Sequence, residues 1–172
     1  MKIKALILAL LFMMPLAKAT AQESATIIMN KAYAQAKKEH KNVFVMFHAS
    51  WCGWCKKMEK NMQADATKTF FDDNYVITAL VVQESPKNKA LENPGAAELL
   101  DKYKGGKAGL PFWVLLDPTG KVLADSFNAK GENLGCPSSA EEVAEFIAKL
   151  KKTSKLKDNQ LAVIANTFTI KK

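Results

Sequence analysis

The hydrophobic pattern divides the chain into short apolar runs that alternate with amphipathic segments. Apolar residues at helical spacing predict helices over 25–38, 96–103 and 141–150, another that begins near Asp158, and one that follows residue 52. Continuous runs of β-branched and aromatic residues predict strands over 43–47, 75–82, 112–116 and 121–124. Ser138 and Glu141 have the spacing of a capping box at the start of the 141–150 helix.

The order of these elements predicts a mixed sheet. The strand-helix-strand unit over 43–82 requires a parallel pair joined by a right-handed crossover. Asp117-Pro118-Thr119-Gly120 instead suits a tight turn between antiparallel strands. Pro86 to Pro94 has the composition of an exposed polar loop. We therefore expect an α/β fold: a central mixed β-sheet flanked by helices, with extra N- and C-terminal helices.

The first residues have the layout of a secretory signal peptide. Lys2 and Lys4 precede an apolar run over 5–16, and small alanines follow it. The run is shorter than the roughly 20 residues that a membrane span needs. We expect residues 1–21 to be a cleaved signal peptide and 22–172 to be a single domain in an oxidising compartment, the periplasm.

The charge argues against a nucleic-acid reader. The whole chain carries a formal charge of +8, which falls to about +5 without the leader, and every basic residue is Lys. Arginine supplies the bidentate base contacts of most such readers, and the sequence has none. We interpret the charge as a solvated surface that favours acidic partners or anionic membrane surfaces.

Two cysteines in the stretch Ser50-Trp-Cys-Gly-Trp-Cys55 carry the candidate chemistry. They follow the apolar 43–47 run directly and precede a helix on which Cys55, Met58 and Met62 share one face. A cysteine in the first turn of a helix is stabilised as a thiolate by unpaired backbone N–H groups and the helix dipole. Cys52 is therefore the candidate nucleophile, and Cys55, one turn later, the candidate resolving cysteine.

Other uses of this spacing require different neighbours. Haem attachment needs His after the second cysteine, where this chain has Lys56. A metal site would need further ligands, for which Cys136 and His48 are the candidates. A purely structural disulfide over so short a loop would stabilise little. We expect no metal and no organic cofactor.

Trp51-Cys52-Gly53-Trp54-Cys55-Lys56 after a buried strand, with Gly109-Leu110-Pro111 opening a later one, resembles the thioredoxin superfamily. The chain is more closely similar to exported thioredoxin-like proteins of the disulfide-isomerase and disulfide-reductase types. The resemblance covers about residues 24–151 and leaves 152–172 as a C-terminal helical extension. It implies that Pro111 is a cis-proline facing Cys52, where the neighbouring backbone docks an extended substrate.

The chain departs from the superfamily pattern around the motif. Met46 occupies the position of a buried acid that takes the proton of the resolving cysteine, which leaves water, Lys56, Lys57, Glu59 or His48 for that role. His48 replaces an aromatic residue and titrates near neutral pH, so it either tunes the thiolate or has no role.

Gly53 and Trp54 place no positive charge between the cysteines, so we expect a reducing to intermediate potential. Trp51 and Trp54 would shape a hydrophobic substrate surface beside exposed sulfurs. Cys136 is a spare buried thiol or forms a regulatory or intermolecular disulfide.

The sequence thus predicts a periplasmic thiol-disulfide oxidoreductase that reduces or isomerises disulfides of exported proteins. We expect it to be recharged by a membrane or periplasmic electron donor, and to be a monomer because no dimerisation domain is visible. The alternative is a non-catalytic binding module of the same fold, a chaperone or metal carrier that uses Cys52, Cys55 and His48.

Overall fold

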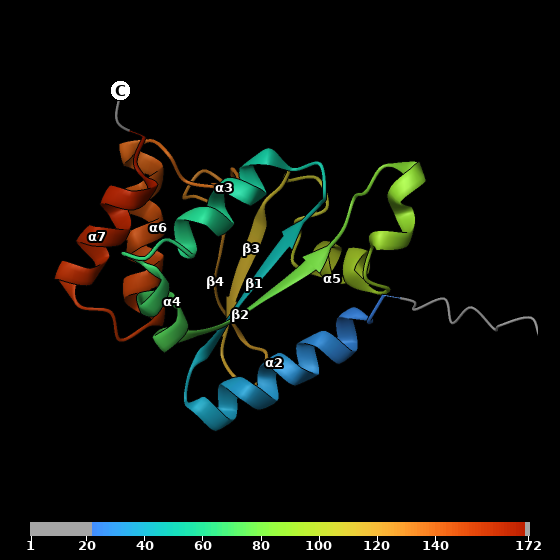
Figure 1. The fold of residues 1–172 in the computed structure, drawn as a ribbon, viewed down its shortest axis with the longest axis horizontal. Coiled ribbons are helices and arrows are strands. Elements are labelled where there is room, and N and C mark those ends of the chain that lie inside the picture. Colours follow the sequence, from blue (N-terminus) through green and yellow to red (C-terminus); the bar gives the residue numbers. More distant parts are fainter. Residues whose placement is uncertain (1–21, 171–172) are drawn as a thin grey trace, which may run out of the picture.

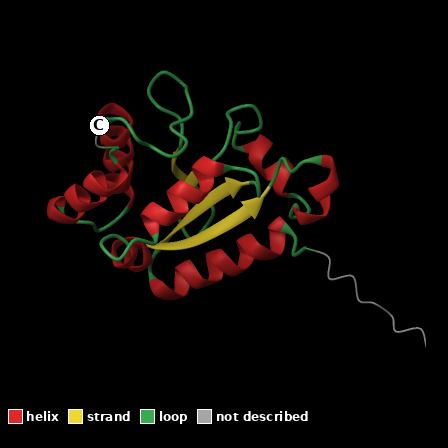
Figure 2. Cartoon of the chain, turned by 45° about the horizontal axis from the view of Figure 1, so that its top comes forward, coloured by secondary structure: helices red, strands yellow, loops and turns green. Residues whose placement is uncertain are grey.

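The computed structural model describes residues 22–170 and places four strands in one mixed sheet (Figures 1 and 2). The strand order is β2-β1-β3-β4, in which β1 pairs parallel with β2 and antiparallel with β3, and β3 pairs antiparallel with β4. The elements are α2 (Ala25–Glu39), β1 (Asn42–His48), α3 (Gly53–Met62), α4 (Lys68–Asn74), β2 (Tyr75–Val81), η1 (Pro86–Leu91), α5 (Ala96–Lys102), β3 (Phe112–Leu116), β4 (Val122–Asp125), α6 (Ala140–Thr153) and α7 (Asp158–Phe168). The predicted α/β architecture is confirmed.

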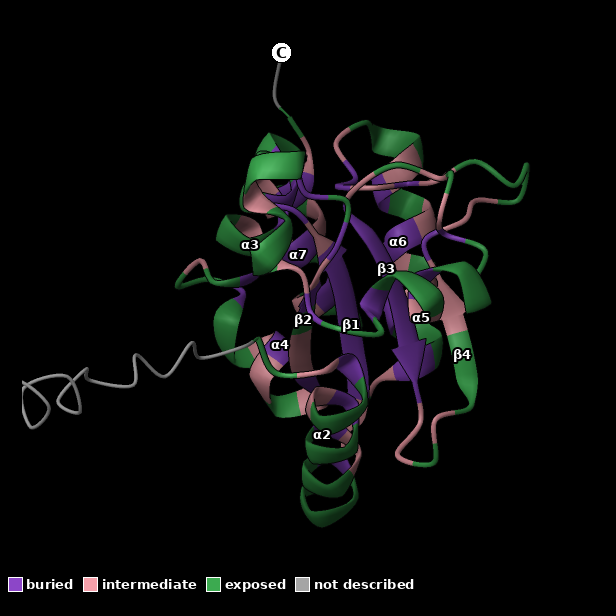
Figure 3. Ribbon diagram, turned by 90° about the vertical axis from the view of Figure 1, so that its right-hand side faces the viewer, coloured by how far each residue is buried: buried purple, intermediate pink, exposed green. Residues whose placement is uncertain are grey.

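Alternating side chains of the central strands build two separate cores, one on each face of the sheet. The ribbons of β1 and β3 are buried along nearly their whole length (Figure 3). Val43, Val45 and Phe47 of β1 pack against α2 and α5, whereas Phe44 and Met46 face α3, α4, α6 and α7. Because successive strand residues point to opposite faces, a strand that is covered on both sides must be apolar throughout. The uninterrupted run of β1 therefore reflects helices on both faces.

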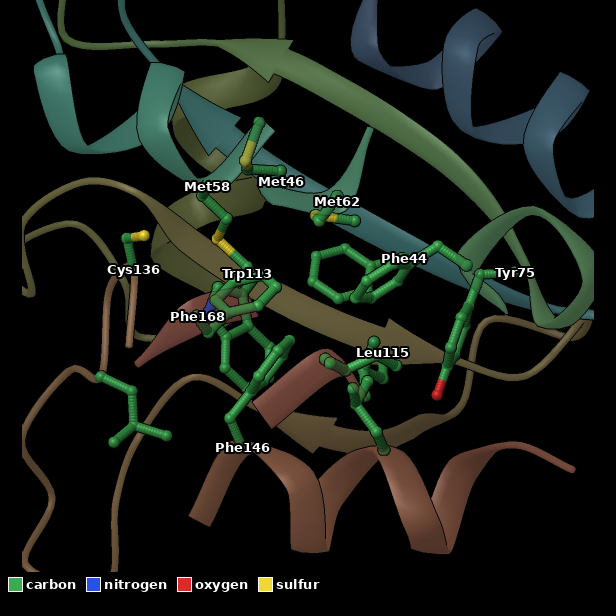
Figure 4. Packing of buried hydrophobic residues seen from close by; sticks show 14 of the residues in the cluster. Phe44, Met46, Met58, Met62, Tyr75, Trp113, Leu115, Cys136, Phe146 and Phe168 are labelled. Atoms are coloured by element: carbon green, nitrogen blue, oxygen red, sulfur yellow. The ribbon is translucent and has the colours of Figure 1, made fainter. Parts of the chain in front are cut away.

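The C-terminal helices complete the second of these cores (Figure 4). The rings of Trp113 of β3, Phe146 of α6 and Phe168 of α7 pack in a row at steep angles, with centroids 5.3 Å and 5.1 Å apart. Ile170 donates its backbone N–H to the carbonyl of Ser138, which ties the end of α7 to the start of α6. The extension is thus part of the hydrophobic core.

Two segments differ from the sequence prediction. The short helix α4 was not predicted, because among its residues only Phe71 is buried and one buried position gives no helical periodicity. The predicted loop over 86–94 contains the 3₁₀ helix η1, and Asn93 behind it is buried, where its side-chain oxygen accepts the N–H of Val81.

The capping box of α6 lies one residue later than predicted. Ser139 is the N-cap, its hydroxyl accepts the N–H of Glu142, and the Glu142 carboxylate accepts the N–H groups of Ser139 and Ser138. Two serines followed by two glutamates offer the same spacing in two registers. The burial of Val143, Phe146 and Leu150 selects the register, because it sets the rotation of the helix on the core.

The predicted signal peptide, residues 1–21, lies outside the described residues. Between residues 22 and 170, no helix is both long and apolar enough to cross a membrane.

Candidate active site

The cysteine pair lies where β1 ends and α3 begins. A turn closed by the N–H of Cys52 on the carbonyl of Ala49 (3.0 Å) reverses the chain after β1. Cys52 is the N-cap of α3, its backbone is extended, and its sulfur accepts the N–H of Cys55 at 3.1 Å. The two cysteines form a disulfide with their Cα atoms 5.3 Å apart. The sulfur of Cys52 thus accepts a hydrogen bond from one of the N–H groups that have no partner within the helix.

The two sulfurs are buried, although exposed sulfurs were predicted from the sequence. Cys52 and Cys55 are only 3% and 2% exposed, whereas Trp51 and Trp54 are 59% and 51% exposed. The indole N–H of Trp51 is held by the carbonyl of Gln83 at 2.9 Å. The tryptophans therefore form the apolar surface around the disulfide, while the disulfide itself is largely covered.

Lys56, Lys57 and Gly53 lie in or next to the motif, and Lys57 contacts a flanking tryptophan. The ammonium of Lys57 lies 5.2 Å from the ring centroid of Trp54, a cation–π contact, while Lys56 is exposed. A Cβ at Gly53 would meet no atom within 4 Å, so no close approach requires glycine there.

The segment that precedes β3 lies against the disulfide. The Leu110–Pro111 peptide bond is cis, and Leu110 packs on the cluster formed by Ala49, Cys52 and Cys55. Within residues 22–170, neither the N–H nor the C=O of Leu110 makes a hydrogen bond. Leu110 thus offers one unpaired backbone donor and one unpaired acceptor next to the cysteine pair.

A cavity of about 270 Å³ opens beside Leu110. Its lining includes Trp54, Leu110, Asn133 and Cys136. Cys136 is buried at the edge of the sulfur-rich core that contains Met46 and Met58 (Figure 4). Burial raises the pKa of its thiol to about 11, so Cys136 is protonated at neutral pH and is a poor nucleophile.

His48 ends β1, close to acidic groups. Burial lowers the pKa of its imidazole, although the charges of Glu59 and Glu84 oppose this shift. A neutral imidazole at pH 7 can accept a proton.

Met46 belongs to the core on the α3 face, outside the cluster around the cysteines. Met46 is thus neither acidic nor packed on the disulfide.

Glu84 is a site residue that sequence analysis missed. It is only 7% exposed, and its two carboxylate oxygens accept the backbone N–H and the hydroxyl of Ser50, at 2.5 Å and 2.7 Å. Its neighbour Gln83 holds Trp51 with its carbonyl and donates its side-chain amide to the carbonyl of Gly106 at 2.9 Å. These two residues link the motif turn to the segment before Pro111. Gln83 and Glu84 directly follow the apolar run of β2, and polar residues at the end of a buried strand are candidates for a functional site.

The hydrogen bonds of Glu84 predict a pH-dependent contribution to stability. The N–H of Ser50 lowers the carboxyl pKa below its ordinary value of 4.5, so this contribution is complete above that value and is lost as pH falls through the lower folded-state pKa. Glu84→Gln should lower the melting temperature by about 3 °C at pH 7 and by less at acidic pH.

Thermal melts between pH 7 and 3 measure this difference. Glu141→Gln is the matched control, because it removes the same charge from an exposed residue. An equal shift in both variants, or a shift for Glu84→Gln that does not shrink in acid, would contradict the prediction.

The candidate metal ligands are not brought together. In the described part of the chain, no group of three or more His, Cys, Asp or Glu side chains could hold a metal ion. The site therefore consists of a disulfide at a helix start, an unpaired backbone edge at Leu110, and flanking tryptophans.

Comparison with known proteins agrees with this architecture. A family model described as thioredoxin-like matches residues 24–118, more than half of the chain. The chain is 36% identical to bovine (Bos taurus) protein disulfide-isomerase A5 over 64 residues, which cover 37% of this chain and 12% of that protein. It is 33% identical to the thiol:disulfide interchange protein DsbD of Photorhabdus laumondii over 88 residues, 51% of this chain and 14% of that protein.

The match to the fold extends further than the sequence matches. The crystal structure of a disulphide isomerase from Xylella fastidiosa superimposes with a TM-score of 0.52 at 20% identity, covering 88% of this chain and 91% of that one. The chain spans only about an eighth of the curated relatives that it matches. On its matched residues, its mixed sheet and its disulfide-bonded Cys52–Cys55 pair, the protein belongs to the thioredoxin-like family.

Proposed function

We propose that the protein is a periplasmic thiol-disulfide oxidoreductase that reduces or isomerises disulfides of exported proteins through Cys52 and Cys55. The observation that carries the proposal is the sulfur of Cys52 at the N-cap of α3, where it accepts the N–H of Cys55. That bond and the helix dipole favour a thiolate at Cys52 once the disulfide is reduced.

The reaction proceeds by two exchanges. The Cys52 thiolate attacks one sulfur of a substrate disulfide, forms a mixed disulfide and expels the other substrate sulfur as a thiolate. Cys55 then attacks the sulfur of Cys52, releases the second substrate thiolate and restores the Cys52–Cys55 disulfide. Two electrons pass from the protein to the substrate, and the substrate thiolates take up two protons. A dithiol donor reverses these steps on the protein.

The second exchange requires that Cys55 lose its proton. We take His48 as the acceptor of that proton, because burial lowers the pKa of its imidazole and His48 ends β1, directly before the turn that carries the cysteines. Lys57 lies over Trp54 and holds a positive charge beside the exposed indole.

The backbone edge at Leu110 is the proposed docking point for substrate. An extended peptide would pair with its N–H and C=O, as in the addition of a short strand, while Trp51 and Trp54 cover apolar side chains. Residues 1–21 direct export, residues 22–172 act as a monomeric domain, and a membrane or periplasmic dithiol protein supplies electrons. The similarity of the chain to DsbD, a thiol:disulfide interchange protein, is consistent with such a donor.

Trapping with Cys55→Ser tests the proposal. This variant should accumulate mixed disulfides on Cys52 with exported proteins, which reducing agents release and mass spectrometry identifies. A Cys136→Ser background removes the third thiol as a source of adducts. Cys52→Ser should trap far fewer partners. Equal retention of partners by both variants, insensitive to reductant, would contradict the enzyme and support the binding module.

A further inference from the structure

The backbone on both sides of Leu110 is held by one side chain. The amide nitrogen of Asn133 lies 3.1 Å from each of three carbonyl oxygens, those of Ala108, Gly109 and Pro111. An amide has two hydrogens, so at least one of them is shared. Of the four consecutive carbonyls in this segment, only that of Leu110 is left out, and Leu110 is the residue that contacts the disulfide.

Asn133 is itself fixed by the loop that carries it, residues 126–137. Its side-chain oxygen accepts the N–H of Gly135 at 3.0 Å, and its backbone forms an isolated antiparallel bridge with Phe127. The carbonyl of Gly135 in turn accepts the indole N–H of the fully buried Trp113 at 2.9 Å. The side-chain amide of Asn133 is therefore connected to the core through Gly135 and to the backbone of residues 108–111 through its NH₂ group.

We infer that Asn133 is a positioning residue that sets the orientation of the Leu110 peptide groups toward a bound substrate strand. The inference rests on the proposed function. A peptide that pairs with Leu110 brings its disulfide to Cys52 only if the N–H and C=O of Leu110 keep their direction, because small errors of placement slow a reaction strongly. Fixing the carbonyls before and after Leu110 holds that direction, while the N–H and C=O of Leu110 itself make no hydrogen bond within residues 22–170.

Asn133→Asp isolates this role, because the carboxylate is nearly isosteric. It keeps the acceptor for Gly135 but places an oxygen against three carbonyls that lose their donor. Reduced protein is mixed with a short peptide that contains one disulfide, or with cystamine, a small disulfide without a peptide backbone. Trp fluorescence follows its oxidation. The half-saturating peptide concentration should rise about tenfold, while the cystamine rate and the glutathione redox equilibrium stay unchanged.

Asn133→Ala should raise the half-saturating peptide concentration by about threefold, because it removes the donor to the three carbonyls without adding repulsion. Asn128→Asp is the matched control in the same loop. Its amide donates to Glu132 and not to the carbonyls around Leu110, so its half-saturating peptide concentration should equal that of the wild type.

Three results separate the possible failures. A half-saturating peptide concentration that is unchanged in Asn133→Asp overturns the inference. Equal losses of reaction rate with the peptide and with cystamine also overturn it, because Asn133 would then support the fold or the disulfide itself. A wild-type protein that reacts with neither disulfide would instead refute the proposed function.

Discussion

Cys52→Ser is expected to lower the rate of insulin-disulfide reduction by about a thousandfold or more, because the attacking sulfur is lost. A serine hydroxyl at the N-cap still accepts the N–H of Cys55, so α3 should keep its start. The loss should therefore appear without a matching loss of stability. Turbidity of reduced insulin measures the rate, and circular dichroism reports the fold.

Cys136→Ser is the matched control for this experiment. Its thiol lies in the buried core, and burial raises its pKa, so it should not act as a nucleophile. Its insulin activity should stay within about twofold of the wild type. Activity that survives in Cys52→Ser but disappears in Cys136→Ser would move the reactive sulfur to residue 136.

Trp113→Ala should lower the free energy of unfolding by about 4 kcal/mol. The Trp113 side chain is fully buried at the centre of the core on the α3 face, between Phe44 and Phe146, and its indole N–H bonds the carbonyl of Gly135. Removing it leaves a cavity and an unpaired carbonyl. Urea unfolding followed by circular dichroism measures the change.

Trp54→Ala provides the comparison at the surface. Its indole is half exposed and contacts Lys57, so its replacement should cost less than about 1 kcal/mol. Similar losses in the two variants would mean that Trp113 is not packed at the centre of the core.

Much of the fold follows from local pattern. The run at Val43 to Phe47 is apolar at every position, and a strand of that kind requires helices on both faces. Cys55, Met58 and Met62 all point inward from α3, as their helical spacing predicts. The short helix α4 could not be found this way, because it buries Phe71 alone.

The candidate site was predictable only in part. Cys52 and Cys55 are three positions apart and lie at a junction that periodicity locates, so their pairing needs no long-range information. Glu84 meets Ser50 across 34 residues, and Asn133 meets Ala108 across 25. A single polar residue in a loop carries no signal of such a partner.

Local sequence is enough to predict the strand that is covered on both faces and the helix that starts at the cysteine pair, because these depend on neighbours within a few residues. The packing of distant segments covers the sulfurs, half-buries His48 near Glu59 and Glu84, and brings the Asn133 amide to the carbonyls around Leu110. Burial and hydrogen bonding between distant segments depend on how the loops at the strand ends pack together, and local periodicity does not encode that packing.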